Sequence, residues 1–459
     1  MTFKKFLFFC FFAFVTGAIY GQDFVQISEI KIVGNTQTKA WIIQREMNIK
    51  AGDSLLLKDT AALLGYNVNQ LLNLNLFNHV YLQLEGTVLI VNVLEQWYWL
   101  PIPTIEVADR NFNQWLLSKD PSRLIYGLEL KLKNLRGRNE SFYGTFAVGY
   151  TKIADFKYVI PALRKHPNTG LILEAGWLAN REVWYKTANN KVQFYDSDIR
   201  SAIVKKKLGI TFSRRKGNQI YHNFYANFNQ TKLKDNEVNE VLNPSMLGNG
   251  NAKLTNFGVG YNFILDKRDI RGQPLVGNYY NTNISVNYVT PNTQYAIMPL
   301  LNYRSSHFRH LKGRWFTSTG FHLKASFPPK QAYVLNRAIG YEYNVMRGYE
   351  YYVIDGNHSA VVKTNLKYAI LLNKNLKFSF IPVKNYKRAN NTLFAVAFFD
   401  AGYAHNRYAL ASNTFANEPL YGYGIGAEWI VWFDRIVRLE FANNHINKPG
   451  VYLSFRMGI

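Results

Sequence analysis

Apolar and polar residues alternate over much of this sequence. In residues 128–133, Leu-Glu-Leu-Lys-Leu-Lys, every second side chain is apolar, and residues 284–288 show the same pattern with uncharged polar partners. Near the end of the chain, Val451, Leu453 and Phe455 form an apolar set, with Tyr452 and Ser454 between them. A period of two places such sets on opposite faces of a β-strand. The chain is therefore predicted to be mainly β.

Sixteen alternating segments, separated by turn residues, follow one another from residue 103 onward. Four of them lie at residues 103–113, 169–186, 197–213 and 359–371. A soluble β-sandwich and a closed transmembrane barrel both have this pattern. An even strand count suits a barrel, closure leaves no unpaired strand edge in lipid, and the 31 Tyr and 32 Phe residues suit aromatic girdles. We expect a 16-stranded antiparallel transmembrane β-barrel.

Residues 23–96 show a different order of elements. An extended segment at residues 25–33 is followed by a turn and helix cap at residues 34–36 and by a helical stretch from Thr38 to Met47. Asp59 can cap a second helix, and two closing strands follow at residues 80–84 and 88–94. This β-α-α-β-β order predicts a small α+β domain at residues 23–96, with the barrel at residues 97–459. A free strand edge in such a unit can bind an extended polypeptide, although a structural spacer would have the same pattern.

The first 22 residues have the pattern of a secretory signal peptide. Lys4 and Lys5 precede the ten-residue apolar run from Phe6 to Val15, and small residues follow up to Gly21. Ten residues are too few for a helical membrane span. The only cysteine, Cys10, lies inside this segment, so no disulfide is expected. An exported chain meets no chromosome, and the net charge of +24 therefore indicates anionic lipid phosphates rather than nucleic acid as partners.

The order of the strands assigns a side of the membrane to each connection. If the first strand leaves the periplasm, the segment after the eighth strand is a periplasmic turn. This turn contains Asp266, Arg268, Asp269, Gly272, Pro274 and Gly277. The long connection at residues 328–359 falls on the outer side, where it either covers the barrel or folds into the lumen.

Motifs at these positions resemble those of a known family. Met346-Arg347-Gly348-Tyr349 in the sixth outer loop matches an aliphatic-Arg-Gly-aromatic signature, and residues 398–402, Phe-Phe-Asp-Ala-Gly, resemble a Phe-x-Asp-x-Gly pattern. Residues 266–277 resemble a turn with Asp-Arg-Asp, Pro and Gly, and residues 30–35 resemble the start of a periplasmic domain. The chain thus resembles the BamA/TamA outer-membrane assembly superfamily, or bacterial surface antigen family, in a short form with a single polypeptide-transport-associated (POTRA) domain. The resemblance covers essentially the whole chain after residue 22.

The resemblance implies an ion pair inside the barrel. In the family the loop-six arginine folds into the lumen and pairs with acidic groups of the inner wall, which here implies a pair between Arg347 and Asp400, close to Gly402. Gly348 would permit a tight backbone, and Tyr349 would wedge the loop against the wall. An exposed loop tip is the alternative interpretation of these residues.

One position departs from the family. Lys367 lies where the family often has an acid, so a positive charge is expected near Arg347. This charge would weaken the pairing of Arg347 or shift it wholly to Asp400, Asp355 or Glu350.

The resemblance implies a non-enzymatic outer-membrane barrel, with its small domain in the periplasm, that assists insertion, assembly or translocation of other polypeptides. Expected partners are unfolded or extended outer-membrane or secreted polypeptides, membrane lipids, and periplasmic or lipoprotein accessories. The alternative is a passive porin-like barrel or a structural accessory subunit of another complex. No Gly-x-Ser-x-Gly elbow occurs, and His307 and His310 have no third ligand nearby, so no enzyme activity, cofactor or metal is expected.

Overall fold

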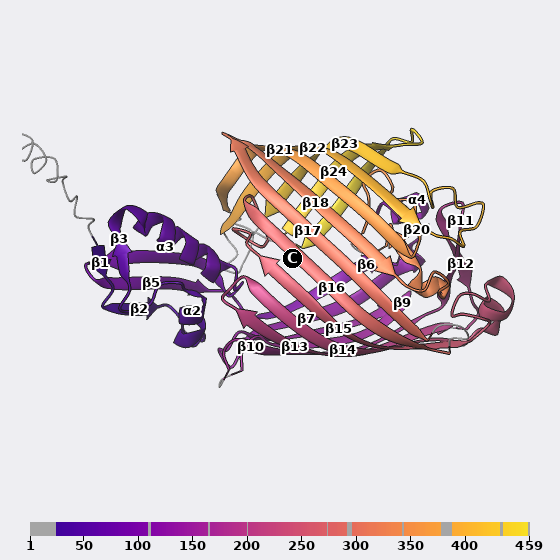
Figure 1. The fold of residues 1–459 in the computed structure, drawn as a ribbon, viewed down its shortest axis with the longest axis horizontal. Helices are drawn as coiled ribbons and strands as arrows, with labels where there is room; N and C mark the ends of the chain where they lie inside the picture. Colours follow the sequence, from indigo (N-terminus) through magenta and orange to yellow (C-terminus); the bar gives the residue numbers. More distant parts are fainter. Residues whose placement is uncertain are drawn as a thin grey trace, which may run out of the picture.

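The computed structural model describes residues 24–108, 112–163, 166–199, 201–272, 274–291, 296–341, 344–377, 388–431 and 435–457. The predicted signal peptide at residues 1–22 lies outside these residues. Figure 1 shows a small unit, drawn in indigo, beside a large barrel-shaped sheet. We call the end of the barrel next to the small unit the proximal end and the opposite end the distal end.

The small unit is built from short strands and two helices. Its elements are β1 (Phe24–Gln26), β2 (Glu29–Val33), α2 (Ala40–Glu46), β3 (Ser54–Leu56), α3 (Leu57–Leu72), β4 (Phe77–Glu85) and β5 (Val88–Glu95). The sheet has the order β2-β5-β4, in which β5 is parallel to β2 and antiparallel to β4. Leu56, and not Asp59, is the N-cap of α3, because Asp59 already lies in its first turn. At that position its negative charge interacts favourably with the positive N-terminal end of the helix dipole.

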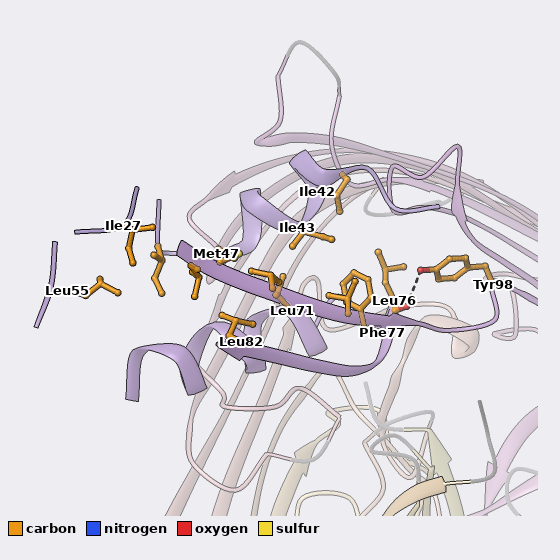
Figure 2. Close-up of a cluster of buried hydrophobic side chains, with 14 residues drawn as sticks. Ile27, Ile42, Ile43, Met47, Leu55, Leu71, Leu76, Phe77, Leu82 and Tyr98 are labelled. Carbon is orange, nitrogen blue, oxygen red and sulfur yellow. Dashed lines mark hydrogen bonds between the residues drawn. The ribbon is translucent and has the colours of Figure 1, made fainter. Parts of the chain in front are cut away.

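Apolar side chains from both helices and the sheet form the core of this unit (Figure 2). Ile42 and Ile43 of α2 and Leu71 of α3 are fully buried against Leu89 and Val91 of β5. Each buried aliphatic side chain stabilises the fold by about 1.5–3 kcal/mol. Tyr98 closes the core at its end near the barrel, where its hydroxyl donates to the Leu76 carbonyl oxygen at 3.1 Å.

The barrel sheet contains sixteen antiparallel strands, each paired with its neighbour in chain order. They are β6 (Trp99–Val107), β7 (Leu124–Leu135), β8 (Glu140–Gly149), β9 (Thr151–Ile160), β10 (Thr169–Asn180), β13 (Ile203–Lys216), β14 (Ile220–Leu233), β15 (Lys253–Asp266), β16 (Gly277–Thr290), β17 (Ile297–Lys312), β18 (Trp315–Ser326), β21 (His358–Lys377), β22 (Arg388–His405), β23 (Leu420–Val431), β24 (Arg435–Asn444) and β25 (Gly450–Met457). The predicted 16-stranded antiparallel barrel is confirmed. The ladder ends at β6 on one side and at β25 on the other, and we call the boundary between these two strands the seam.

Some strand boundaries differ from the sequence-based ones. The first strand ends at Val107, and the short helix α4 (Phe112–Ser118) occupies the end of the predicted segment 103–113. The predicted segment 169–186 divides into β10 and the first part of β11 (Glu182–Ala188), which forms a separate hairpin with β12 (Lys191–Asp196). Asn189 and Asn190 turn this hairpin with φ values of 53° and 58°, a conformation that Asn adopts readily in two-residue hairpin loops.

Alternation along the barrel strands separates an apolar outer surface from a polar interior. On β13, Leu208, Ile210 and Phe212 are exposed by 57%, 49% and 46%, and on β25 Val451 and Phe455 are exposed by 62% and 60%. An apolar outward band is the surface that a transmembrane barrel presents to lipid. Among the residues that the structure describes, none of the helices combines the length and apolarity of a membrane span.

Candidate functional site

Loop six, the connection between β18 and β21, packs inside the distal half of the barrel. Met346 and Tyr349 of its four-residue motif are fully buried, in a cluster with Ile339, Val361 and other apolar side chains from the loop and from strands β21, β22 and β23. Two short strands within the loop, β19 (Arg337–Ile339) and β20 (Ile354–Asp355), pair with each other. The motif is therefore an internal packing element and not an exposed loop tip.

Arg347 and Asp400 form a buried ion pair. Arg347 Nε donates to Asp400 Oδ2 at 2.9 Å, its Nη2 donates to Oδ1, and its backbone N–H donates to Oδ2 at 3.1 Å. The Asp400 side chain on β22 is completely buried, and the Arg347 side chain is 15% exposed. This bidentate geometry is the strong form of a guanidinium–carboxylate contact.

Neighbouring groups satisfy the remaining donors of the guanidinium. Arg347 Nη1 donates to Asn365 Oδ1 at 2.6 Å, and its Nη2 donates to the Thr364 carbonyl oxygen at 3.3 Å. The guanidinium carbon lies 3.9 Å from the centre of the Phe398 ring, and Glu440 Oε1 lies 3.6 Å from Nη1. The arginine thus contacts three strands, β21, β22 and β24, which fixes the loop in one position.

Glycines allow the motif to approach the barrel wall. Gly348 has φ of +85°, and its carbonyl oxygen accepts a hydrogen bond from Asn444 Nδ2 at 2.7 Å. A Cβ on Gly402 would lie 2.5 Å from Met346 Sδ, and one on Gly422 would lie 2.1 Å from the Arg347 carbonyl oxygen. Gly402 and Gly422 therefore make room for the loop on β22 and β23.

Tyr349 holds the other end of the motif. Its hydroxyl donates to the Tyr421 carbonyl oxygen at 3.0 Å and is bonded to His445 Nδ1. The Tyr349 and His445 rings stack with centroids 5.7 Å apart and planes 15° from parallel. The aromatic side chain thereby joins loop six to β23 and to the turn after β24.

Lys367 does not compete with Arg347. Lys367 Nζ donates to Glu428 Oε1 at 2.6 Å, and Arg438 Nε donates to Glu428 Oε2 at 2.6 Å. This triad on β21, β23 and β24 gives Lys367 a carboxylate other than Asp400, and Arg347 keeps Asp400 as its partner. Asp355 accepts instead from the Tyr341 hydroxyl at 2.5 Å. Glu350 is buried, at 8% exposure.

The turn after β15 contains an ion pair between two of its own residues, Arg268 and Asp266. Arg268 donates to both oxygens of Asp266 at 2.8 Å, and the guanidinium carbon of Arg268 lies 4.6 Å from the centre of the Tyr279 ring. Asp269 Oδ1 accepts from the Leu275 N–H at 3.1 Å. Gly272 and Pro274 lie in the same turn, and Gly277 begins β16.

This turn contacts the small unit through Asn73 at the end of α3. Asn73 Nδ2 donates to the Asp269 carbonyl oxygen at 3.2 Å, and Asn73 Oδ1 accepts from the Arg271 N–H at 3.0 Å. A neighbouring turn contributes Gly137, whose carbonyl oxygen accepts from the Lys39 N–H at 2.9 Å. The small unit is therefore docked on the proximal turns.

A buried carboxylate, Glu46, also contributes to this docking surface. Glu46 of α2 accepts from Arg215 Nη1 and Nη2 at 2.8 and 2.7 Å and from Arg45 Nε at 2.9 Å. Burial would raise the pKa of Glu46, but the hydrogen bonds and charges of Arg215 and Arg45 outweigh it and hold the pKa below its usual value of 4.5. The contribution of this contact is therefore complete at neutral pH and is lost as the pH falls below 4.5 through the lowered pKa.

Replacement of Arg215 tests this docking contact. Arg215→Ala leaves Glu46 buried with Arg45 alone, which should weaken docking by about 1–3 kcal/mol, the cost of an under-satisfied buried group. Chymotrypsin cleavage after Trp97, which is 47% exposed between the small unit and the barrel, should become at least severalfold faster. Arg214→Ala removes an exposed neighbouring charge and is the control. Equal cleavage rates in both variants would show that Arg215 does not hold the unit.

The two histidines considered as a metal site have other partners. His307 Nδ1 is bonded to Asn278 Oδ1 at 3.1 Å, and His310 Nε2 to the Gly313 carbonyl oxygen at 2.8 Å. Within the described parts of the chain, no group of three metal-ligating side chains comes together.

Sequence reasoning missed several residues of the loop-six site. Asn365, Gly422, Glu440 and Asn444 come from three different strands and from no recognised motif. The sequence indicates these residues only through the alternation of faces along a strand. By this alternation Glu440 lies on the same face of β24 as Arg438, the lumen face.

No protein-family model matches the sequence, and no curated protein matches it. Among solved structures, the fold is similar to that of CdiB from Escherichia coli, with a TM-score of 0.55, 14% identity, and coverage of 94% of this chain and 76% of CdiB. It is also similar to that of BamA from Haemophilus ducreyi lacking POTRA domains 1–3, with a TM-score of 0.52, 13% identity, and coverage of 94% and 84%. This similarity confirms the barrel architecture and the resemblance to BamA-type proteins at the level of the fold.

Proposed function

We propose that this chain is a non-enzymatic outer-membrane barrel that assists the insertion, assembly or translocation of other polypeptides. The observation that carries the proposal is the loop-six motif, held in the lumen by the Arg347–Asp400 pair within a BamA-like fold. A passive pore needs an open lumen, whereas here a buried loop is fixed inside it. The small unit would then lie in the periplasm, as a single POTRA domain.

The small unit supplies a surface for extended clients. Its sheet ends at β2 and β4, and β4 carries Tyr81 at 61% exposure. An extended polypeptide can add to such an edge through main-chain hydrogen bonds. Docking through Glu46 and Asn73 would hold this edge at a fixed position below the barrel.

Anionic lipids are the second proposed partner. On β13 the exposed apolar residues Leu208 to Phe212 have Lys206 before them, and Arg214 and Lys216 after them, on the same face of the strand. Basic side chains at both rims of an apolar band can reach lipid phosphates.

Depletion of the protein tests the proposed function. Levels of particular outer-membrane or secreted proteins should fall, as measured by quantitative proteomics of the membrane and secreted fractions, and the wild-type chain should restore them. An unchanged proteome together with reduced solute uptake would indicate the passive porin-like barrel instead.

A further inference from the structure

Loop six and one side of the barrel wall enclose a cavity in the lumen. Arg337, Tyr341 and Asn344 of the loop line one side, and residues of β15, β16, β17 and β18, which are neighbours in the sheet, line the other (Figure 1). The cavity has a volume of about 410 Å³, a size typical of small-molecule sites. Arg347 and Asp400 are not among the lining residues, so the cavity is distinct from the loop-six site described above.

The cavity is lined by cations that lack a carboxylate partner. Arg304 of β17 and Arg337 of loop six form no ion pair with any carboxylate that the structure describes, and Lys324 of β18 adds a third positive charge. Asp355 lies opposite Arg337 in the β19–β20 register and offsets at most one of these charges. None of the described lining residues is acidic. The cavity therefore has a positive surface, which favours an anionic ligand.

A row of carboxamides lies beside these cations. Asn262 of β15 pairs with Asn283 of β16, and Asn283 pairs with Asn302 of β17, so the three side chains share one face of the sheet. Each carboxamide has two N–H donors and one carbonyl acceptor, and each sugar hydroxyl also donates and accepts. A sugar can therefore use both halves of every carboxamide, whereas an inorganic phosphate ion offers almost only acceptors. The row indicates a ligand with several hydroxyl groups.

One acceptor of this row is unused. Asn262 Oδ1 is buried and has no hydrogen-bond partner among the described residues, and the same is true of His322 Nδ1 on β18. A buried polar atom without a partner costs free energy. The terminal torsion of an Asn side chain is soft, so a small rotation of Asn262, which lines the cavity, would bring Oδ1 to a ligand hydroxyl. Ligand binding would then remove this cost.

We propose that this cavity binds a sugar that carries a carboxylate or phosphate group. Arg304 from the wall and Arg337 from the loop would contact the acid group, and the carboxamide row would bind the hydroxyls. Because β15, β16, β17 and β18 separate the cavity from the lipid-facing surface, the ligand is a soluble sugar acid and not the head group of a membrane lipid. This binding site goes beyond the proposed function and does not depend on it.

Isothermal titration calorimetry of the purified full chain in detergent tests the ligand class. The probes are glucuronate, galacturonate and glucose 6-phosphate, with glucose, galactose and inorganic phosphate as comparisons. At least one sugar acid should bind about tenfold or more tightly than its neutral sugar and than inorganic phosphate, because it alone combines a charged group with hydroxyls. Absence of binding by all three sugar acids would overturn the proposal. Equal affinity for the neutral sugar or for inorganic phosphate would also overturn it, since the cations or the carboxamides would then have no role.

Variants of the wall test the residues. Arg304→Gln should weaken binding of the sugar acid by about tenfold or more, and Arg304→Lys, which keeps the charge but not the planar fork, should weaken it less. Asn302→Leu should weaken binding of the sugar acid and of the neutral sugar alike. Arg309→Gln is the control, because it removes the same charge from the same strand at an exposed position whose Nη1 donates to Asn278 Oδ1 at 2.9 Å. Equal affinities in Arg304→Gln and Arg309→Gln would contradict the proposed site.

Hydrogen exchange locates the bound ligand. A saturating concentration of the tightest-binding sugar acid should slow exchange in residues 337–341 of loop six, and the same concentration should have a smaller effect in Arg304→Gln. Unchanged exchange in the wild type would place the ligand outside the cavity and overturn the inference. These measurements use purified protein, so their failure would leave the proposed assembly function untouched, and a depletion without effect would leave the binding site untouched.

Discussion

Asp400→Asn is expected to destabilise the barrel by about 3–5 kcal/mol and to abolish most of its proposed activity, because it leaves the Arg347 charge buried without its partner. The carboxylate accepts three hydrogen bonds from Arg347 and is completely buried. Arg347→Ala should have an effect of similar size, since it leaves the Asp400 charge alone. The measurement is the temperature at which the folded barrel loses its fast mobility in detergent electrophoresis, together with restoration of client levels after depletion.

Two further variants separate the ion pair from general damage. A double Arg347→Met/Asp400→Leu variant removes both charges of the pair and should be more stable than either single variant, because neither partner's charge is left behind without the other. It should still fail to restore client levels if the charged contact is needed for function. Asp196→Asn is the control, since the Arg181–Asp196 pair has both side chains 56% exposed and contributes at most about 1 kcal/mol. Wild-type stability and activity in Asp400→Asn would contradict the proposed role of the loop.

The barrel could be predicted from the sequence because lipid and lumen impose a simple rule on every strand. Alternation at residues 128–133 or 284–288 needs no knowledge of neighbouring strands, and each such segment is a strand of the barrel. The boundaries were less predictable where local pattern was ambiguous. Residues 112–118, Phe-Asn-Gln-Trp-Leu-Leu-Ser, form helix α4, although a mixed apolar stretch after a strand can equally extend it.

The centre of the candidate site was predictable only through motifs. Arg347 and Asp400 are 53 residues apart, and nothing in their local pattern indicates contact without the family resemblance. The residues that complete the site depend on register across strands. Lys367 was expected near Arg347, yet its partner is Glu428, 61 residues away on a strand that does not pair with β21. Contacts between side chains on strands that do not pair depend on the curvature of the barrel. The alternation of apolar and polar residues along a strand carries no information about this curvature.

Glu428→Gln is the second variant expected to have a large effect. Glu428 is 4% exposed and accepts from Lys367 and Arg438, both at 2.6 Å. Loss of the carboxylate charge leaves two cations facing each other in the barrel wall, so a destabilisation of about 3–5 kcal/mol is expected. The folded band in detergent electrophoresis should therefore disappear at a lower temperature than in the wild type.

The size of this effect should depend on burial and not on the presence of an ion pair alone. Glu174→Gln is the matched control, because Glu174 and Lys157 also pair across neighbouring strands, at 3.1 Å, but are 37% and 43% exposed. Water can solvate the remaining lysine there, so the loss should be at most about 1 kcal/mol. Adding Lys367→Met to Glu428→Gln should recover part of the lost stability, because a single cation remains. Equal losses in Glu428→Gln and Glu174→Gln would show that the triad is solvated like an ordinary lumen pair and does not hold β21, β23 and β24 together.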